Sequence, residues 1–220
     1  MSSLNDLCGC FQNWAGLSDT DMAAYVHRLN SLGLISGGGG AKGPAPIIVD
    51  DAIWMLLIVF AGGDVKRAQD IAELVNSQQT VADAKVSDGD PAITLFDGLR
   101  DIINLRRAGL LIVGGDFRLL EDGERVSAVI SAEIVLEAPL FAFPAGSRVV
   151  GNFAFGPQPG TADDGPRLWQ FTVATMSLID ELANLLGPLP VTSMGLGTGI
   201  SAAAVPIDVA DETASRGTLH

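Results

Sequence analysis

The sequence predicts an α+β fold, with helices in the N-terminal half and an antiparallel, β-rich part in the C-terminal half. Two observations support this prediction. Apolar residues recur at the helical spacing of three or four positions as far as about residue 109, and at the strand spacing of two positions after it. Hydrophobic residues make up 48% of the 220-residue chain, which is enough to form a real core.

We expect three parts along the chain. Residues 1–80 read as a helical domain, and residues 91–188 as a β-rich domain with one leading helix. The polar, small-residue segment 80–90 between them has the composition of a linker. Residues 189–220 are small and polar, which predicts an extended tail.

Capping signals predict the first two helices. Ser3 and Gly16 bound the first one, because a serine hydroxyl caps a helix N-terminus and glycine accepts the left-handed backbone at a C-terminus. Ser18 caps a second helix, which Gly33 ends. The residues expected on the core side of this second helix are Met22, Tyr25, Val26, Leu29 and Leu32.

An apolar run at residues 52–63 predicts a third helix, capped by Asp50 or Asp51. The run is shorter than the roughly 20 residues that cross a bilayer, so we expect a buried helix. It has no polar face, and a small domain cannot easily bury such a helix alone. We therefore expect the chain to self-associate.

Two more helices are expected before the β-rich part. Asp64 caps one that runs to about Gln79, and Asp90 followed by Pro91 opens the other, which ends at Gly109. After that come strand patterns at residues 126–137, 148–155 and 168–174, and a last helix from Ser177 to Leu186. Residues 110–120 are interrupted by Gly-Gly-Asp at 114–116, which indicates a hairpin.

Residues 4–49 carry the most specific pattern in the chain. A helix, a short turn with Gly16 and a second helix are followed by the segment Leu29 to Ile35, a Gly/Pro-rich loop with Lys42, and an apolar return at residues 47–49. This arrangement resembles a winged helix-turn-helix domain. The resemblance implies that the second helix enters the major groove and that the loop forms a wing.

The resemblance also implies a set of DNA-contacting residues. The face of the second helix opposite its apolar stripe is small, polar or basic, and Lys42 would lie at the tip of the wing, where phosphates are commonly contacted. The residues expected to touch DNA are Thr20, His27, Arg28, Ser31 and Lys42.

Charge supports a second interpretation. The chain has a net charge of −13, and residues 1–75 contain four basic and eight acidic side chains. Asp19 and Asp21 occupy the helix N-terminus that a phosphate would otherwise approach. The same helices therefore also fit a protein-binding or oligomerising module.

No pattern in the chain predicts catalysis, a metal or a cofactor. The two cysteines, Cys8 and Cys10, lack the second half of a zinc site, and the two histidines, His27 and His220, form no metal-binding or catalytic motif. Residues 195–199 are glycine-rich but lack the lysine of a nucleotide-binding loop. We expect a protein that is not an enzyme.

The layout of N-terminal helix-turn-helix, middle helix and β-rich C-terminal part is similar to that of bacteriophage small terminase subunits, and the wing-like segment resembles uncharacterised prophage proteins. This implies a DNA-recognition adaptor for genome packaging. Such a protein would form a homo-oligomer, contact double-stranded DNA and a large motor subunit, and work in the cytoplasm of a bacterial host without touching a membrane. The alternatives are a transcriptional regulator with a dimerisation or effector domain, and a structural or virion-associated assembly protein that does not bind nucleic acid.

Overall fold

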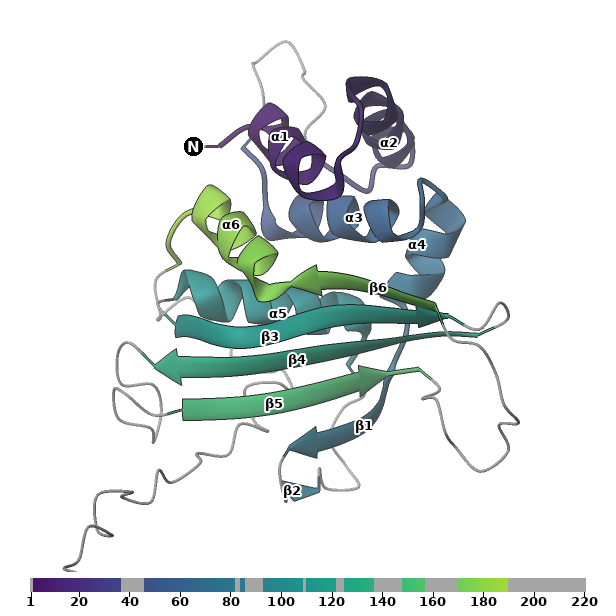
Figure 1. Cartoon of the computed structure of the whole chain (residues 1–220). Helices are drawn as coiled ribbons and strands as arrows, with labels where there is room; N and C mark the ends of the chain where they lie inside the picture. The colour runs from purple at the N-terminus through teal and green to yellow at the C-terminus, as the bar shows by residue number, and fades with distance from the viewer. Residues whose placement is uncertain are drawn as a thin grey trace, which may run out of the picture.

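A computed structural model describes residues 2–36, 46–81, 84–85, 93–108, 110–121, 125–136, 148–156 and 170–189. It shows an α+β protein in which N-terminal helices precede an antiparallel sheet and a C-terminal helix (Figure 1). The helices are α1 (Leu4–Ala15), α2 (Asp19–Ser31), α3 (Val49–Phe60), α4 (Val65–Ala72), α5 (Leu95–Arg107) and α6 (Met176–Leu186). The strands are β1 (Asn76–Val81), β2 (Ala84–Lys85), β3 (Leu110–Glu121), β4 (Val126–Leu136), β5 (Arg148–Phe155) and β6 (Gln170–Thr175).

Helices α1 and α2 begin and end where the capping signals predict. Ser3 and Asp6 form a capping box at the start of α1, and Gly16 ends it with φ 65°. The Ser18 hydroxyl accepts the Asp21 backbone N–H at the start of α2. Leu32, however, is 57% exposed, because it follows the last helical turn and leaves the apolar stripe.

Helix α3 begins earlier than the sequence predicts, and neither Asp50 nor Asp51 caps it. Ile48 is the N-cap residue, and both aspartates lie in the first turn. The Asp51 carboxylate is buried and accepts hydrogen bonds from the Ser36 backbone and hydroxyl (2.7 Å each) and from the Ile48 backbone (2.9 Å). The carboxylate thus joins the start of α3 to the segment that follows α2.

The apolar surface of α3 is covered within one chain. Helices α1, α2, α4 and α5 all contact it, and Ile58 in its middle is fully buried. The expectation that a second copy is needed to cover this helix was therefore wrong. The four neighbouring helices provide the cover, together with Phe117 of β3, whose ring centroid lies 4.9 Å from that of Phe60.

The chain between α4 and α5 differs from the prediction. The Asp64 cap is confirmed, but α4 ends at Ala72, and residues 76–81 form strand β1. The predicted linker thus overlaps β1 and β2. Helix α5 is capped by Thr94, whose hydroxyl accepts the Asp97 backbone N–H, and Asp90 and Pro91 lie outside the described residues.

The six strands form one antiparallel sheet in the order β2-β1-β5-β4-β3-β6. The predicted hairpin at residues 114–116 was wrong, because Gly114, Gly115 and Asp116 all pair with β4 inside the continuous strand β3. The register shifts between Ile112 and Gly114, and glycines in a strand commonly mark such an irregularity.

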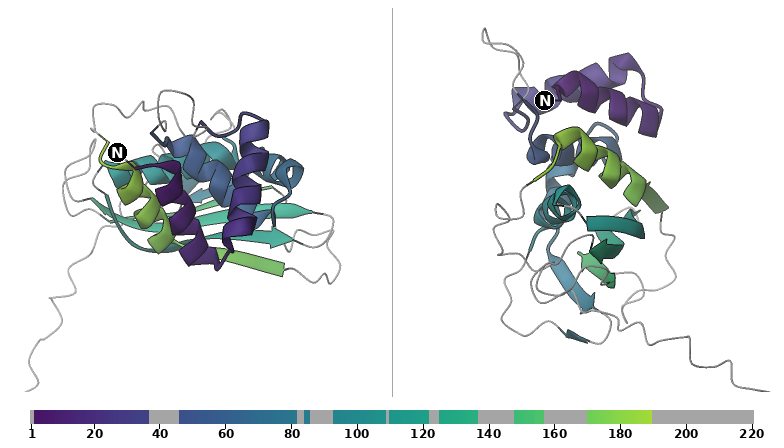
Figure 2. Two further views of the ribbon diagram at one scale, coloured as in Figure 1. Left: turned by 90° about the horizontal axis from the view of Figure 1, so that it is seen from above. Right: turned by 90° about the vertical axis from the view of Figure 1, so that its left-hand side faces the viewer.

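One hydrophobic core includes residues of both the helices and the sheet. In Figure 1 the sheet runs from β6 at the top to β2 at the bottom, and α5 lies alongside β3. The N-terminal helices lie above β6. Helices α1 and α2 form the layer farthest from the sheet, as the side view in Figure 2 also shows. This outer position leaves one side of α2 open to solvent.

Candidate functional site

Helix α2 is fixed by its inner face. Met22 and Leu29 are buried, and Tyr25 and Val26 are half-buried against the core. This arrangement confirms four of the five predicted core positions of the helix; only Leu32 departs from the pattern. Because the inner contacts set the rotation of α2, they also determine which side chains point outward.

The structure brings together four of the five residues predicted to touch DNA. Thr20, His27, Arg28 and Ser31 are all exposed on α2. The Ser31 hydroxyl donates a 2.7 Å hydrogen bond to the Arg28 carbonyl, which places it along the helix backbone. The fifth residue, Lys42, lies outside the described residues.

The described residues on either side of the Gly/Pro-rich loop that contains Lys42 do not form the strands of a wing. Residues 34–36 and 46–48 contain no strand, and Val49, expected in the apolar return, is the first residue of α3. The apolar residues Ile35 and Ile47 are instead buried in the core next to α3. The apolar character of these residues therefore reflects packing in the core rather than a strand beside the loop.

Arg28 is held in place by the turn between α3 and α4. Its Nη1 donates a 2.5 Å hydrogen bond to the Gly63 carbonyl. Gly63 has φ 86°, and a Cβ at this position would lie 2.4 Å from Cε1 of Tyr25 and 3.0 Å from Nη1 of Arg28. Only glycine fits, both for its backbone conformation and for the space around it.

The positive charge of Arg28 is not cancelled by this contact. The carbonyl is a neutral acceptor, and none of the ion pairs between described residues involves Arg28. An exposed guanidinium with a fixed position and no carboxylate partner among the described residues is suited to contact an anion.

The two ends of α2 differ in charge. At its start, Asp21 accepts a hydrogen bond from the Ser18 hydroxyl and Asp19 accepts one from the Gln12 side chain (2.6 Å each). These carboxylates repel a phosphate from the N-terminal turn. The part of α2 that can meet a polyanion is therefore its C-terminal half.

Sequence reasoning did not assign Lys66 to the site. It is exposed in the first turn of α4, three residues after Gly63, so its Cα lies within about 11 Å of the Gly63 Cα. The neighbouring Arg67 forms an ion pair with Glu121, whereas none between described residues involves Lys66. We call Arg28, Gly63 and Lys66 the Gly63 patch. The hydrogen bond from Arg28 to Gly63 brings Arg28 to the turn that leads into α4 and Lys66, and sequence spacing gave no signal for this contact.

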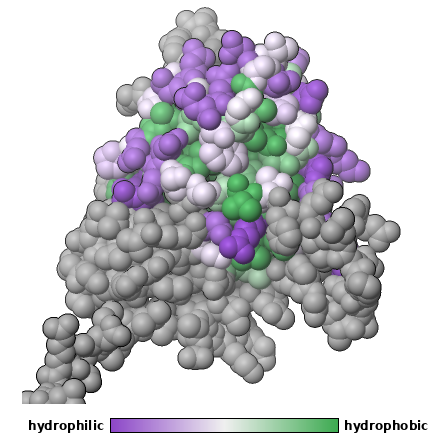
Figure 3. Space-filling model, in the orientation of Figure 1, coloured by the Kyte–Doolittle hydropathy of each residue, from purple (hydrophilic) through white to green (hydrophobic). Residues whose placement is uncertain are grey.

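A groove of about 430 Å³ lies between α1 and α2. Its apolar lining includes Leu4, Cys8, Met22 and Val26, and its polar lining includes Asp19 and His27. Figure 3 shows that hydrophilic residues dominate the surface at the top of the molecule, where α1 and α2 lie, with some apolar surface between them.

The two cysteines show no sign of nucleophilic chemistry. Burial raises the pKa of the Cys8 thiol. Burial and, to a smaller extent, Glu181, which accepts the Cys10 S–H at 3.5 Å, raise the pKa of Cys10 to about 12. Across the described segments, no three His, Cys, Asp or Glu side chains are grouped to hold a metal ion.

Comparison of the chain with protein-family models, curated proteins and solved structures finds no match. No helix in the described part of the chain is long and apolar enough to cross a membrane.

Proposed function

We propose that this protein is a non-catalytic, DNA-binding protein that contacts double-stranded DNA with the C-terminal half of α2. The observation that carries the proposal is the Gly63 patch beside the exposed α2 face, where Arg28 is fixed by a neutral carbonyl and keeps its charge. His27 and Ser31 lie in the same half of the helix and supply further hydrogen-bonding groups.

Within this proposal the biological role is that of a phage or prophage DNA-recognition adaptor for genome packaging. The order of N-terminal helices, antiparallel sheet and C-terminal helix is compatible with the small-terminase-like layout. A single patch with two cations would bind DNA weakly in a chain of net charge −13. A homo-oligomer would repeat the patch and gain avidity, and the sheet-containing part would be left to contact a large motor subunit.

The test is a salt-titrated binding assay with duplexes from the source genome, comparing wild type with Arg28→Ala. Loss of one phosphate contact should lower affinity at low salt and reduce the slope of log K against log salt by about one. Arg118→Ala is the matched control, because Arg118 is exposed on β3, far along the chain from α2, and its charge is paired with Asp116.

Thermal unfolding of each variant separates a lost contact from a lost fold. Absence of wild-type binding at low salt, or identical curves for wild type and Arg28→Ala, would refute DNA contact by α2.

A second candidate function, assembly without nucleic-acid binding, is favoured by the groove between α1 and α2. Its apolar lining and its acidic residue Asp19 suit a protein segment better than a phosphate backbone. Mass measurement of the native particle separates the first two roles: a ring supports packaging, and a dimer supports a transcriptional regulator. A wild type that assembles by mass but does not bind DNA in the binding assay supports the assembly role.

A further inference from the structure

Two consecutive arginines at the end of α5 line a small cavity against the end of α6. The cavity has a volume of about 210 Å³. Arg106 and Arg107 form one side of it, and Ala183, Asn184, Gly187 and Pro188 form the other. The α1–α2 groove and the Gly63 patch share no residue with it.

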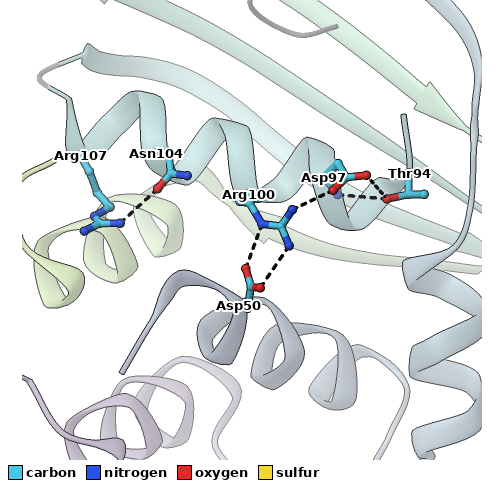
Figure 4. Close-up of polar contacts among 6 residues, drawn as sticks. All are labelled: Asp50, Thr94, Asp97, Arg100, Asn104 and Arg107. Atoms are coloured by element: carbon cyan, nitrogen blue, oxygen red, sulfur yellow. Dashed lines mark hydrogen bonds and ion pairs between the residues drawn. The ribbon is translucent and has the colours of Figure 1, made fainter. Parts of the chain in front are cut away.

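The two arginines differ in whether a carboxylate pairs with their charge. Arg106 is paired, because its Nε lies 2.6 Å from Oδ1 of Asp180. Arg107 donates from Nε to the Gly187 carbonyl (2.8 Å) and from Nη1 to Oδ1 of Asn104 (3.1 Å), the second contact being drawn in Figure 4. Both acceptors are neutral, and within the described segments Arg107 makes no ion pair.

Burial lowers the pKa of the Arg107 guanidinium, since desolvation disfavours its charged form and no carboxylate among the described residues offsets this effect. A helix C-terminus favours a cation nearby, which accounts for an arginine at this position. It does not account for a cavity beside the guanidinium.

Four backbone carbonyls at this corner already have donors. The Arg107 carbonyl accepts the Leu189 N–H (3.0 Å), and the Ala183 and Asn184 carbonyls accept the Gly187 N–H (3.0 and 3.2 Å). The Gly187 carbonyl accepts the Arg107 side chain. Arg107 has further N–H groups beyond those used in these contacts, and the Asn184 carboxamide also lines the cavity.

We propose that this cavity binds a small oxyanion, a carboxylate or phosphate group, with Arg107 as its principal ligand. A planar guanidinium matches such a group with two parallel hydrogen bonds. The cavity is smaller than the 300 Å³ or so of a drug-sized ligand site, which fits a small anion.

The experiment is isothermal titration of the whole chain with sodium phosphate and with sodium acetate, in buffers brought to equal ionic strength with chloride. Saturable binding of phosphate alone identifies a phosphate site, saturable binding of acetate alone a carboxylate site, and binding of both a general oxyanion site. No saturable binding of either anion would overturn the proposal.

Two variants assign the binding to this cavity. Asn184→Asp places a carboxylate beside Arg107 on an exposed position, so the fold should persist and affinity should fall at least tenfold. Asn13→Asp adds the same charge on an exposed position of α1 and should leave affinity within twofold of wild type. Equal affinities for wild type and both variants would overturn the assignment, as would equal losses in the two variants. Because this test involves no DNA, its result is independent of the function proposed above.

Discussion

Arg100 of α5 forms a bidentate (two-pronged) ion pair with Asp50 in the first turn of α3, with Nε–Oδ1 at 2.9 Å and Nη2–Oδ2 at 3.1 Å (Figure 4). Its third nitrogen, Nη1, lies 2.9 Å from Asp97, which Thr94 in turn contacts. The guanidinium carbon is also 5.0 Å from the centre of the Phe96 ring. The pair raises the pKa of Arg100 and joins the N-terminal helices to the helix beside the sheet.

We expect a measurable coupling energy between Arg100 and Asp50. Both side chains are about one-third exposed, so solvent weakens the pair, but its two-pronged geometry is better than that of most surface pairs. A double-mutant cycle with Arg100→Gln and Asp50→Asn, followed by urea unfolding, should give about 0.5–1 kcal/mol. The Arg118 and Asp116 pair, which has a single contact and a 49% exposed arginine, is the control and should give less; equal values for the two pairs would contradict the prediction.

Removing the buried Asp51 carboxylate should cost more than removing Asp50. Asp51→Ala leaves the backbone N–H groups of Ser36 and Ile48 without their acceptor, at a cost of about 2–4 kcal/mol in unfolding free energy. Asp51→Asn should cost less, because an amide oxygen can keep part of the network. Denaturant unfolding measures both, and a change below about 0.5 kcal/mol for Asp51→Ala would show that the carboxylate does not hold this junction together.

Placing a charge at Ile58 should unfold the single chain rather than only separate subunits. Ile58 is fully buried inside one copy, so Ile58→Asp should lower stability by several kcal/mol. Leu32→Asp is the matched control, because Leu32 is 57% exposed, and it should change stability by less than about 0.5 kcal/mol. A folded Ile58→Asp monomer of wild-type stability would mean that α3 is not covered within the chain.

Cys10 should react slowly with alkylating agents. Its pKa of about 12, against an ordinary 9.0, leaves on the order of a thousandfold less thiolate at pH 8. Iodoacetamide rates measured in a Cys8→Ser background report on Cys10 alone. Glu181→Gln should raise the alkylation rate only in part, because burial raises the Cys10 pKa more than Glu181 does. If Cys10 reacts as fast as an unhindered thiol while Glu181 is still present, the prediction is contradicted.

The same thiol makes stability depend on alkaline pH. The folded state holds the Cys10 proton more tightly than the unfolded state does. The contribution of this proton to the free energy of unfolding is therefore complete below pH 9.0 and is lost as pH rises toward about 12. Cys10→Ser should therefore weaken the decline in stability over that interval.

Local signals in the sequence were sufficient for several elements. Ser3, Ser18 and Asp64 cap helices as predicted, because a cap involves only neighbouring backbone N–H groups. The strand pattern at residues 148–155 coincides with β5. The exposed face of α2 was also predictable, since the spacing of Met22 and Leu29 sets the helix rotation.

Other features depended on contacts between distant residues. A continuous β3 through Gly114 and Gly115 exists because β4 pairs with both glycines, whereas the glycines by themselves favour a turn. Ile47 belongs to no strand, because its burial comes from packing in the core beside α3.

The sequence by itself determined the fold class, the first two helices and the outward face that holds Thr20, His27, Arg28 and Ser31, because each of these depends on periodicity and caps within a few residues. Only the tertiary structure decided that α3 is covered by its own chain, that Gly63 fixes Arg28, and that Arg107 meets Gly187 beside a cavity. These contacts join residues 35 and 80 positions apart, and their formation depends on how whole helices pack.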